Sequence, residues 1–527
     1  MKTTIKIIVA SALLAAAACA AELVKTANGL INGEERDGIR SYKGLPFAAP
    51  PVGDLRWKPP QPVKPWEGVR DGTKFGAVCP QPKSILGQKQ EQASEDCLFL
   101  NVWTAATNAG ARLPVMVWIH GGGCTTGAGS QPSYDGTALA RAGVVLVTIN
   151  YRLGPFGYFA HPLLSKESPQ GVSGNYGHLD QIAALQWVQK NIAAFGGDPH
   201  CVTIFGESAG AMSVCRLMVS PQAAGLFQRA IAERGGAYGR NKHLRETRLL
   251  QPSMEAEGER LAKALGCDQA EHPLAALRAK SADELLAASN PAQGLYGKGT
   301  KFGPIVDGWT IPDDPGALFD QGKQHDVPFM TGANADEGTL FLRQMPVQSA
   351  AGYKLTLRTL AGRHADEALR LLPCAGDDDV KAAFTRFSTV TAFVAPARAL
   401  VRAMEQKKTP AFLYHFTRVS PGAKRLGLGA THGAEISYVF DTFRAAGTIT
   451  DKDRELSKVM QACWVQFAKT GNPNGAGLPK WPAYKAATDE HLEFGDEIRV
   501  GHGLYKETCD LLEQLKNERA KKALPAE

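Results

Sequence analysis

The middle of the sequence carries continuous runs of apolar residues, most of them followed by glycine. They span residues 114–120, 144–150, 202–205, 327–331 and 412–416. A strand with one face in water alternates apolar and polar residues, whereas a continuous apolar run fits a strand covered on both faces. These runs therefore predict the buried strands of a parallel sheet.

Between two of these runs, residues 179–192 place apolar side chains at helical spacing. Alternation of strand and helix predicts an α/β fold with right-handed crossovers, in which helices flank a central, mostly parallel twisted sheet. The span from about 336 to 408 is rich in Ala, Leu and Arg and predicts a helical insertion over one end of the sheet. Near the N-terminus, Asn28-Gly29 and Asp37-Gly38 indicate hairpin turns, the first of type I′.

The first twenty residues have the layout of a secretory signal peptide. Lys2 and Lys6 precede an apolar run that is too short to span a bilayer, and Ala18-Cys19-Ala20 offers a cleavage site. Lipoprotein anchoring through Cys19 is the alternative, and it is disfavoured because Ala16 stands where a Leu normally occurs. We therefore expect residues 1–20 to be a signal peptide, residues 21–527 to form one large domain, and the protein to be secreted or periplasmic.

Composition and charge narrow the class of partner. The chain is 44% hydrophobic and 21% charged, which is ordinary for a globular protein. Its net charge of +7 falls to +5 without the signal peptide, and there is no dense Lys/Arg block with interleaved aromatic residues. Nucleic acid is therefore not expected as a partner, and no later segment is long and apolar enough to predict a membrane span.

The cysteines suggest a disulfide rather than a metal site. Ten cysteines become nine without Cys19, and export permits disulfides. Cys79 and Cys97 enclose a short, loop-like segment and are the first choice for a bridge, whereas Cys201 and Cys215 lie in apolar stretches and are interpreted as buried thiols. Neither C-x-x-C nor H-E-x-x-H occurs, so no metal is expected.

The pentapeptide Gly206-Glu-Ser208-Ala-Gly210 fits the pattern G-x-S-x-G. Five residues of this kind can also be a glycine-rich turn with a structural serine. The preceding apolar strand and a following helix at 211–218 favour a nucleophile elbow, a sharp turn that exposes the Ser208 hydroxyl. A hydroxyl needs a base to take its proton, and the base needs a third group to orient it.

A second glycine-rich loop, His120-Gly-Gly-Gly123, also follows an apolar strand. Its backbone N–H groups, with that of Ala209, could bind a developing oxyanion. A phosphate-binding turn is the alternative, but neither G-x-x-x-x-G-K-[ST] nor a clean G-x-G-x-x-G is present. His120 precedes Ser208, in a fold whose base comes last, so a structural role is favoured for it.

The base and the acid are sought downstream of Ser208. Of the eight histidines there, His432 stands out because it closes a glycine-rich loop after a strand. Asp307, Asp336 and Glu337 all lie between Ser208 and His432, in the order serine, acid, histidine typical of α/β-hydrolases. The residues by themselves do not choose among these three acids.

Seven motifs in order resemble those of the type B carboxylesterase and cholinesterase family, from about residue 23 to about residue 495. They are Glu95–Asn101, Asn150–Gly157, Gly174–Gln181, Phe195–Pro199, the turn at Ser208, Asp336–Gly338 and His432–Glu435. The resemblance implies the α/β-hydrolase fold and ester hydrolysis without a cofactor.

The resemblance also implies roles for individual residues. Glu337 matches the triad acid, Gly122, Gly123 and Ala209 match the oxyanion hole, and Glu207 and Glu435 match acids beside the triad. Cys79 and Cys97 match a family disulfide. Arg56 with Glu95, and Arg152 with Asp180, match structural ion pairs.

One departure concerns Arg234, which stands where the family usually has a serine close to the triad. Arg234 could lie in a solvated basic loop, paired with Glu233 or a nearby acid, or Arg234 or the basic residues that follow it could hold a carboxylate of the substrate. We therefore expect a secreted serine carboxylesterase with Ser208, His432 and Glu337 as the triad, acting on a small-molecule ester. With Arg234 as a carboxylate anchor, the substrate would be an ester of a di- or polycarboxylic acid. The alternatives are hydrolysis of an amide or carbamate by the same triad, or a non-catalytic adhesion protein on the same fold.

Overall fold

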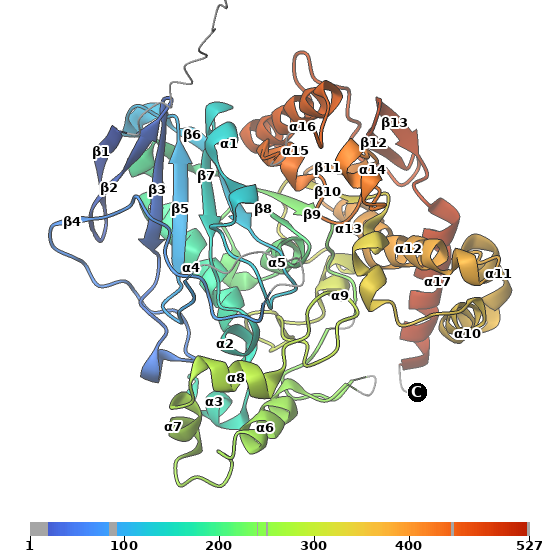
Figure 1. The fold of residues 1–527 in the computed structure, drawn as a ribbon, viewed down its shortest axis with the longest axis horizontal. Coiled ribbons are helices and arrows are strands. Elements are labelled where there is room, and N and C mark those ends of the chain that lie inside the picture. The colour runs from blue at the N-terminus through green and yellow to red at the C-terminus, as the bar shows by residue number, and fades with distance from the viewer. Residues whose placement is uncertain (1–18, 84–91, 240, 249–250, 444–446, 524–527) are drawn as a thin grey trace, which may run out of the picture.

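The computed structural model describes residues 19–83, 92–239, 241–248, 251–443 and 447–523 (Figure 1). Within these ranges the strands form one twisted sheet of 13 strands, in the order β1-β2-β3-β5-β7-β6-β8-β9-β10-β11-β12-β13, with β4 paired to β2. The strands are β1 (Cys19–Thr26), β2 (Gly29–Arg36), β3 (Ile39–Pro46), β4 (Val69–Arg70), β5 (Phe99–Thr104), β6 (Leu113–Ile119), β7 (Val145–Ile149), β8 (Gly197–Glu207), β9 (Arg229–Glu233), β10 (Phe329–Asn334), β11 (Ala411–Phe416), β12 (Glu490–Phe494) and β13 (Ile498–His502).

The central part of the sheet is parallel, as the apolar runs predict. Every neighbouring pair from β7 to β12 is parallel, whereas β1, β2, β3 and β5 at one edge and β13 at the other pair antiparallel. All five predicted strands are present, as β6, β7, β8, β10 and β11. The carboxyl ends of the parallel strands meet along one edge of the sheet, and this is where function is expected in such folds.

Both predicted hairpins form, with different turns. Asp37 and Gly38 join β2 to β3 with φ of 51° and 74°, the conformation of a type I′ turn. At the first hairpin Thr26 pairs with Gly29, so Ala27 and Asn28 form the turn, and neither has a positive φ. The prediction of type I′ at Asn28-Gly29 is therefore wrong, because Gly29 already belongs to the strand.

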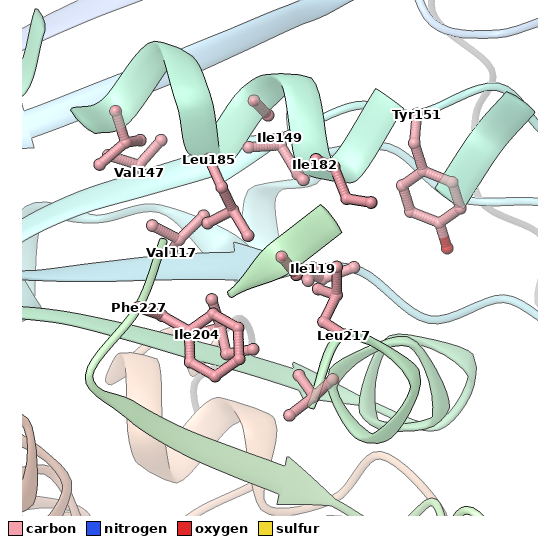
Figure 2. Close-up of a cluster of buried hydrophobic side chains, with 14 of the residues drawn as sticks. Val117, Ile119, Val147, Ile149, Tyr151, Ile182, Leu185, Ile204, Leu217 and Phe227 are labelled. Atoms are coloured by element: carbon pink, nitrogen blue, oxygen red, sulfur yellow. The ribbon is translucent and has the colours of Figure 1, made fainter. Parts of the chain in front are cut away.

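Apolar side chains form one layer on each face of the sheet. On one face, alternate residues of β6, β7 and β8 pack against the long helix α4 and the helices α5 and α13, and Figure 2 shows part of this layer, including Val117, Val147, Ile182 and Ile204. On the other face, Met116, Trp118, Leu146 and Phe205 pack with α1, α15 and α16. Burial on both faces explains why these strands are apolar at every position.

Helices connect successive parallel strands as crossovers, and two of these connections, from β9 to β10 and from β10 to β11, each contain several helices. Helices α10 to α13 lie between β10 and β11, where the helical insertion is predicted, and α13 contributes Leu400 and Val401 to the main core. Helices α6 to α8, between β9 and β10, were not predicted (Figure 1). The helices are α1 (Thr137–Arg141), α2 (Gly154–Tyr158), α3 (Pro162–Glu167), α4 (Tyr176–Asn191), α5 (Ala209–Leu217), α6 (Met254–Ala264), α7 (Pro273–Arg278), α8 (Ala282–Ser289), α9 (Pro315–Asp320), α10 (Ala350–Ala361), α11 (Ala365–Leu371), α12 (Val380–Thr389), α13 (Ala395–Met404), α14 (Pro421–Arg425), α15 (Ile436–Phe440), α16 (Asp451–Thr470) and α17 (Lys506–Ala523).

Candidate active site

Ser208 lies on a strained turn between β8 and α5. Its φ of 56° and ψ of −118° are unfavourable for any residue with a side chain, and such strain persists only where the surrounding structure enforces it. Gly206 and Gly210 allow the turn to approach β6, because a Cβ atom on either would lie within 2.5 Å of the Ile119 carbonyl oxygen. This is the nucleophile-elbow geometry, which presents the serine at the end of a central strand.

The loop after β6 lies directly against this turn. A Cβ atom on Gly121 would be 3.2 Å from Ser208 Cβ, and Gly122 and Gly123 have positive φ of 97° and 65°. In the described part of the chain no acceptor is recorded for the N–H groups of Gly122, Gly123 or Ala209. Three backbone donors therefore remain available near Ser208, as oxyanion stabilisation requires.

His120 has a structural setting. Its Nδ1 lies 2.8 Å from the Gly121 carbonyl oxygen and its ring stacks on Tyr151 at 4.4 Å. Burial lowers the pKa of His120 to about 4, so the ring is neutral at pH 7.

His432 and Glu337 lie in contact at the carboxyl edge of the sheet. Glu337 lies just after the end of β10, and His432 lies in the loop after β11. His432 Nδ1 is 2.5 Å from Glu337 Oε2. The other Glu337 oxygen accepts a hydrogen bond of 2.7 Å from the Asn334 N–H. The imidazole is packed by the rings of Phe341 and Phe393, at 5.3 and 4.9 Å. Its orientation is therefore fixed from two sides.

The second ring nitrogen, His432 Nε2, lies 3.1 Å from Glu207 Oε1, and within the ranges described no hydrogen bond joins it to Ser208. Catalytic hydrogen bonds to the nucleophile are often long without substrate and tighten when it binds. Burial lowers the pKa of His432 to about 4, against the opposing effect of Glu207, so the ring is neutral and can accept a proton at pH 7.

The other two candidate acids hold loops instead. Asp336 Oδ2 accepts a hydrogen bond of 2.8 Å from the Ala430 N–H and so fixes the loop that carries His432. Asp307 accepts backbone N–H groups of its own turn through Oδ1 and the Asn175 amide through Oδ2. Glu337 is thus the one of the three that contacts His432.

Arg234 is fully buried behind His432 and Glu337, on the segment that follows β9. Its Nη2 lies 3.1 Å from Glu207 Oε1, and its Nε lies 2.5 Å from Glu435 Oε1 and 4.0 Å from Glu337 Oε1. With no exposed surface, the guanidinium is neither in a solvated loop nor open to a substrate carboxylate. The pairing with nearby acids that was predicted for Arg234 is present, but in a buried and not a solvated setting. The interpretation of Arg234 as an anchor for a substrate carboxylate is corrected, because its partners are acids of the protein itself.

Further acids surround this arginine. Glu207 and Glu435 lie beside His432 and Glu337, as the resemblance implies, and burial raises the pKa of both. Sequence reasoning missed Glu233, whose Oε1 accepts a hydrogen bond of 2.8 Å from Trp464 Nε1, and Asn334, which bonds both Glu337 and Glu435. No local signal marks these two side chains, since their side-chain partners, Trp464 for Glu233 and Glu435 for Asn334, are distant in sequence.

The two structural ion pairs are confirmed. Arg152 forms a buried two-point contact with Asp180, at 2.7 and 2.8 Å, and Arg56 pairs with Glu95. In the described ranges, no group of three or more His, Cys, Asp or Glu side chains is placed to hold a metal ion.

Cys79 and Cys97 are buried neighbours that are present as thiols. A side-chain hydrogen bond with Cys79, followed by burial, raises the pKa of Cys97 well above its usual range. The bridge is therefore not formed in this structure and stays a prediction for the exported protein, where it would stabilise the fold by about 3 kcal/mol. Peptide mapping of the exported protein under non-reducing conditions should give the linked pair, whereas alkylation of both as free thiols would contradict it.

The fold, the strained serine turn and the histidine loop are together those of an α/β-hydrolase. The family model described as "Carboxylesterase family" matches residues 20–512. The chain is 40% identical to fumonisin B1 esterase of Sphingopyxis macrogoltabida, over 91% of this chain and 87% of that protein, and 36% identical to para-nitrobenzyl esterase of Bacillus subtilis, over 91% and 96%. A solved PNB esterase structure superimposes with a TM-score of 0.80 at 36% identity, covering 93% of this chain and 99% of that one.

The chain therefore belongs to the carboxylesterase family, and it is an ester hydrolase of the α/β-hydrolase fold.

Proposed function

We propose that this protein is a secreted serine carboxylesterase in which Ser208 is the nucleophile, His432 the base and Glu337 the acid that orients it. The observation that carries the proposal is the 2.5 Å contact between His432 Nδ1 and Glu337 Oε2, beside the strained turn of Ser208. A carboxylate on Nδ1 fixes the tautomer that leaves Nε2 free to accept a proton.

In this mechanism Ser208 Oγ attacks the ester carbonyl as His432 Nε2 takes its proton. The resulting oxyanion accepts hydrogen bonds from the N–H groups of Gly122, Gly123 and Ala209. His432 then gives the proton to the leaving alcohol, and water hydrolyses the acyl-enzyme by the reverse sequence. Every step uses groups of this chain, so the proposal includes no cofactor.

His432 Nε2 must exchange its contact with Glu207 for one with Ser208 before the attack. Glu207 and Ser208 are adjacent in sequence, so the contact with Glu207 places His432 Nε2 beside the turn that carries the proposed nucleophile. In the proposed tautomer Nε2 carries a lone pair, so a hydrogen bond between Nε2 and Glu207 requires a proton on the Glu207 carboxyl, whose pKa is raised by burial.

Removal of the Ser208 hydroxyl tests this mechanism, with turnover of p-nitrophenyl acetate as the measurement. Turnover by the native protein separates the proposal from a non-catalytic adhesion protein. The same triad can attack an amide or a carbamate, so a matched ester, amide and carbamate of one acyl group would establish which bond is preferred.

Esters of di- or polycarboxylic acids remain part of the proposal, with Lys301 in place of Arg234 as the anchoring cation. Lys301 precedes Phe302, which packs with Ala209, and its amine donates to the Leu295 carbonyl at 2.6 Å. Leu295 packs with Phe341 and Phe393, the rings on His432. Lys301 therefore lies between the segments that contact the nucleophile turn and the base.

No carboxylate lies within 4.0 Å of the Lys301 amine or of its neighbour Lys242 in the residues that the structure describes. Burial lowers the pKa of both amines, and each donates to a backbone carbonyl. Glu257 acts on Lys242, whereas in the described residues Lys301 forms no ion pair, so Lys301 is the cation that could face a negatively charged group on the substrate.

Lys301→Ala should therefore reduce kcat/KM for a dicarboxylic half-ester about tenfold or more, and that for its neutral isostere much less, because an unscreened ionic contact is lost only with the former. The exposed Lys458→Ala on α16 serves as the matched control. An equal effect on both substrates would show that Lys301 does not bind a carboxylate.

Secretion is proposed from the N-terminal sequence. Residues 1–18 of the predicted signal peptide lie outside the described residues, and Cys19 and Ala20 begin β1. Among the described helices, none has the length and apolar character needed to cross a membrane.

A further inference from the structure

A cluster of buried charges encloses the contact between Glu337 and His432. Glu207 ends β8, Arg234 follows β9, Glu337 follows β10 and Glu435 precedes α15, so four segments far apart in sequence meet here. Arg234, Glu337 and Glu435 have 0% exposure and Glu207 has 5%.

Arg234 provides the positive charge of this cluster. It lies within 4.0 Å of Glu207, Glu337 and Glu435, and no other Lys or Arg in the described ranges lies that close to any of the three. An ionised carboxylate without a compensating charge is strongly unfavourable in the interior, where it takes up a proton instead. A serine, the usual family residue, could donate one hydrogen bond but could not supply this charge.

We propose that Arg234 is a positioning residue for ester hydrolysis, whose buried charge favours the ionised form of Glu337 and thereby fixes the orientation of His432. The inference rests on the proposed triad. It adds Arg234 as a residue that acts through the triad, at a position where an uncharged serine is expected from the resemblance. The planar guanidinium can face several acids at once, which a lysine amine does less well.

The charge of Arg234 predicts in which direction the pH dependence of kcat/KM shifts when this residue is replaced. His432 is faced by Glu207 and Glu337, and Glu337 by Arg234, the Asn334 N–H and Asp336. Glu233 of β9 and Tyr414 of β11 complete the titratable groups around the arginine.

The charge of Arg234 lowers the pKa of both Glu337 and His432, opposing burial in the first case and adding to it in the second. The active form requires ionised Glu337 and neutral His432, so both effects move the acid limb of activity to lower pH. Without this charge both pKa values rise, and the acid limb of kcat/KM should move upward by about 1–3 pH units.

The test compares two neutral variants, Arg234→Ser and Arg234→Gln, with the charged variant Arg234→Lys. The neutral variants should show the upward shift and a lower kcat at pH 7. Arg234→Lys should keep the acid limb near that of the native enzyme and lose part of kcat. Arg398→Ser, which breaks the buried pair of Arg398 with Asp489 on another part of the fold, is the matched control. It should lower Tm without moving the limb.

A folded neutral variant with the native acid limb would overturn the inference. The inference would also be overturned if both neutral variants failed to fold while Arg234→Lys kept the native kcat, because Arg234 would then serve stability alone. Failure of the proposed triad would instead appear as activity in Ser208→Ala, so the two failures are distinguishable.

Discussion

Ser208→Ala should reduce kcat for p-nitrophenyl acetate by ~10⁴-fold or more, the usual range for loss of a nucleophile that acts as a unit with its base. The substitution deletes one oxygen and keeps the Cβ atom, so the strain at φ 56° is unchanged and no large cavity forms. The residual activity should come from the three backbone N–H donors and substrate binding, which do not depend on the hydroxyl.

Two further measurements, Tm and the p-nitrophenol burst, separate loss of the nucleophile from loss of folding. Tm should stay within about 2 °C of the native value, since little packing is lost. A burst of p-nitrophenol equal to the enzyme concentration, if the native protein shows one, should disappear. Native-like turnover in a folded Ser208→Ala variant would contradict the mechanism and place the nucleophile elsewhere.

Glu337→Gln should reduce kcat by about 10³–10⁴-fold, because an amide N–H facing His432 Nδ1 stabilises the wrong tautomer. Asp336→Asn should stay within about tenfold of the native value, since its Oδ1 can still accept from the Ala430 N–H. The two variants each remove one negative charge at adjacent positions, so they form a matched pair.

Measurement of kcat and Tm for both variants separates catalysis from stability. Asp336→Asn should lower Tm slightly by loosening the loop from 427 to 433, with activity preserved. The reverse order of the two kcat values would move the acid to Asp336 and contradict the contact seen between Glu337 and His432.

The strands at 114–120, 144–150, 202–205, 327–331 and 412–416 were predictable, because a strand buried on both faces is apolar at consecutive positions. The run at 202–205 identified β8, but the strand begins at Gly197, before the apolar residues. Gly197 pairs with Leu113 of β6, and the register then shifts, so that regular pairing resumes only at Val202 with Val115. The edge strand β13 and its neighbour β12 are only partly apolar and were not predicted, because neither contains a continuous apolar run.

The sequence by itself determined the central strands, the turn at Ser208 and the glycine-rich loop at 120–123, because glycine spacing and apolar runs act over a few residues. Only the tertiary structure decided which neighbouring acid faces His432, since Asp336 and Glu337 point to partners about ninety residues away. It also decided the place of Arg234, which a local reading put in a loop or beside the substrate. The energy of a buried charge depends on the acids around it, and here these come from three other segments of the chain.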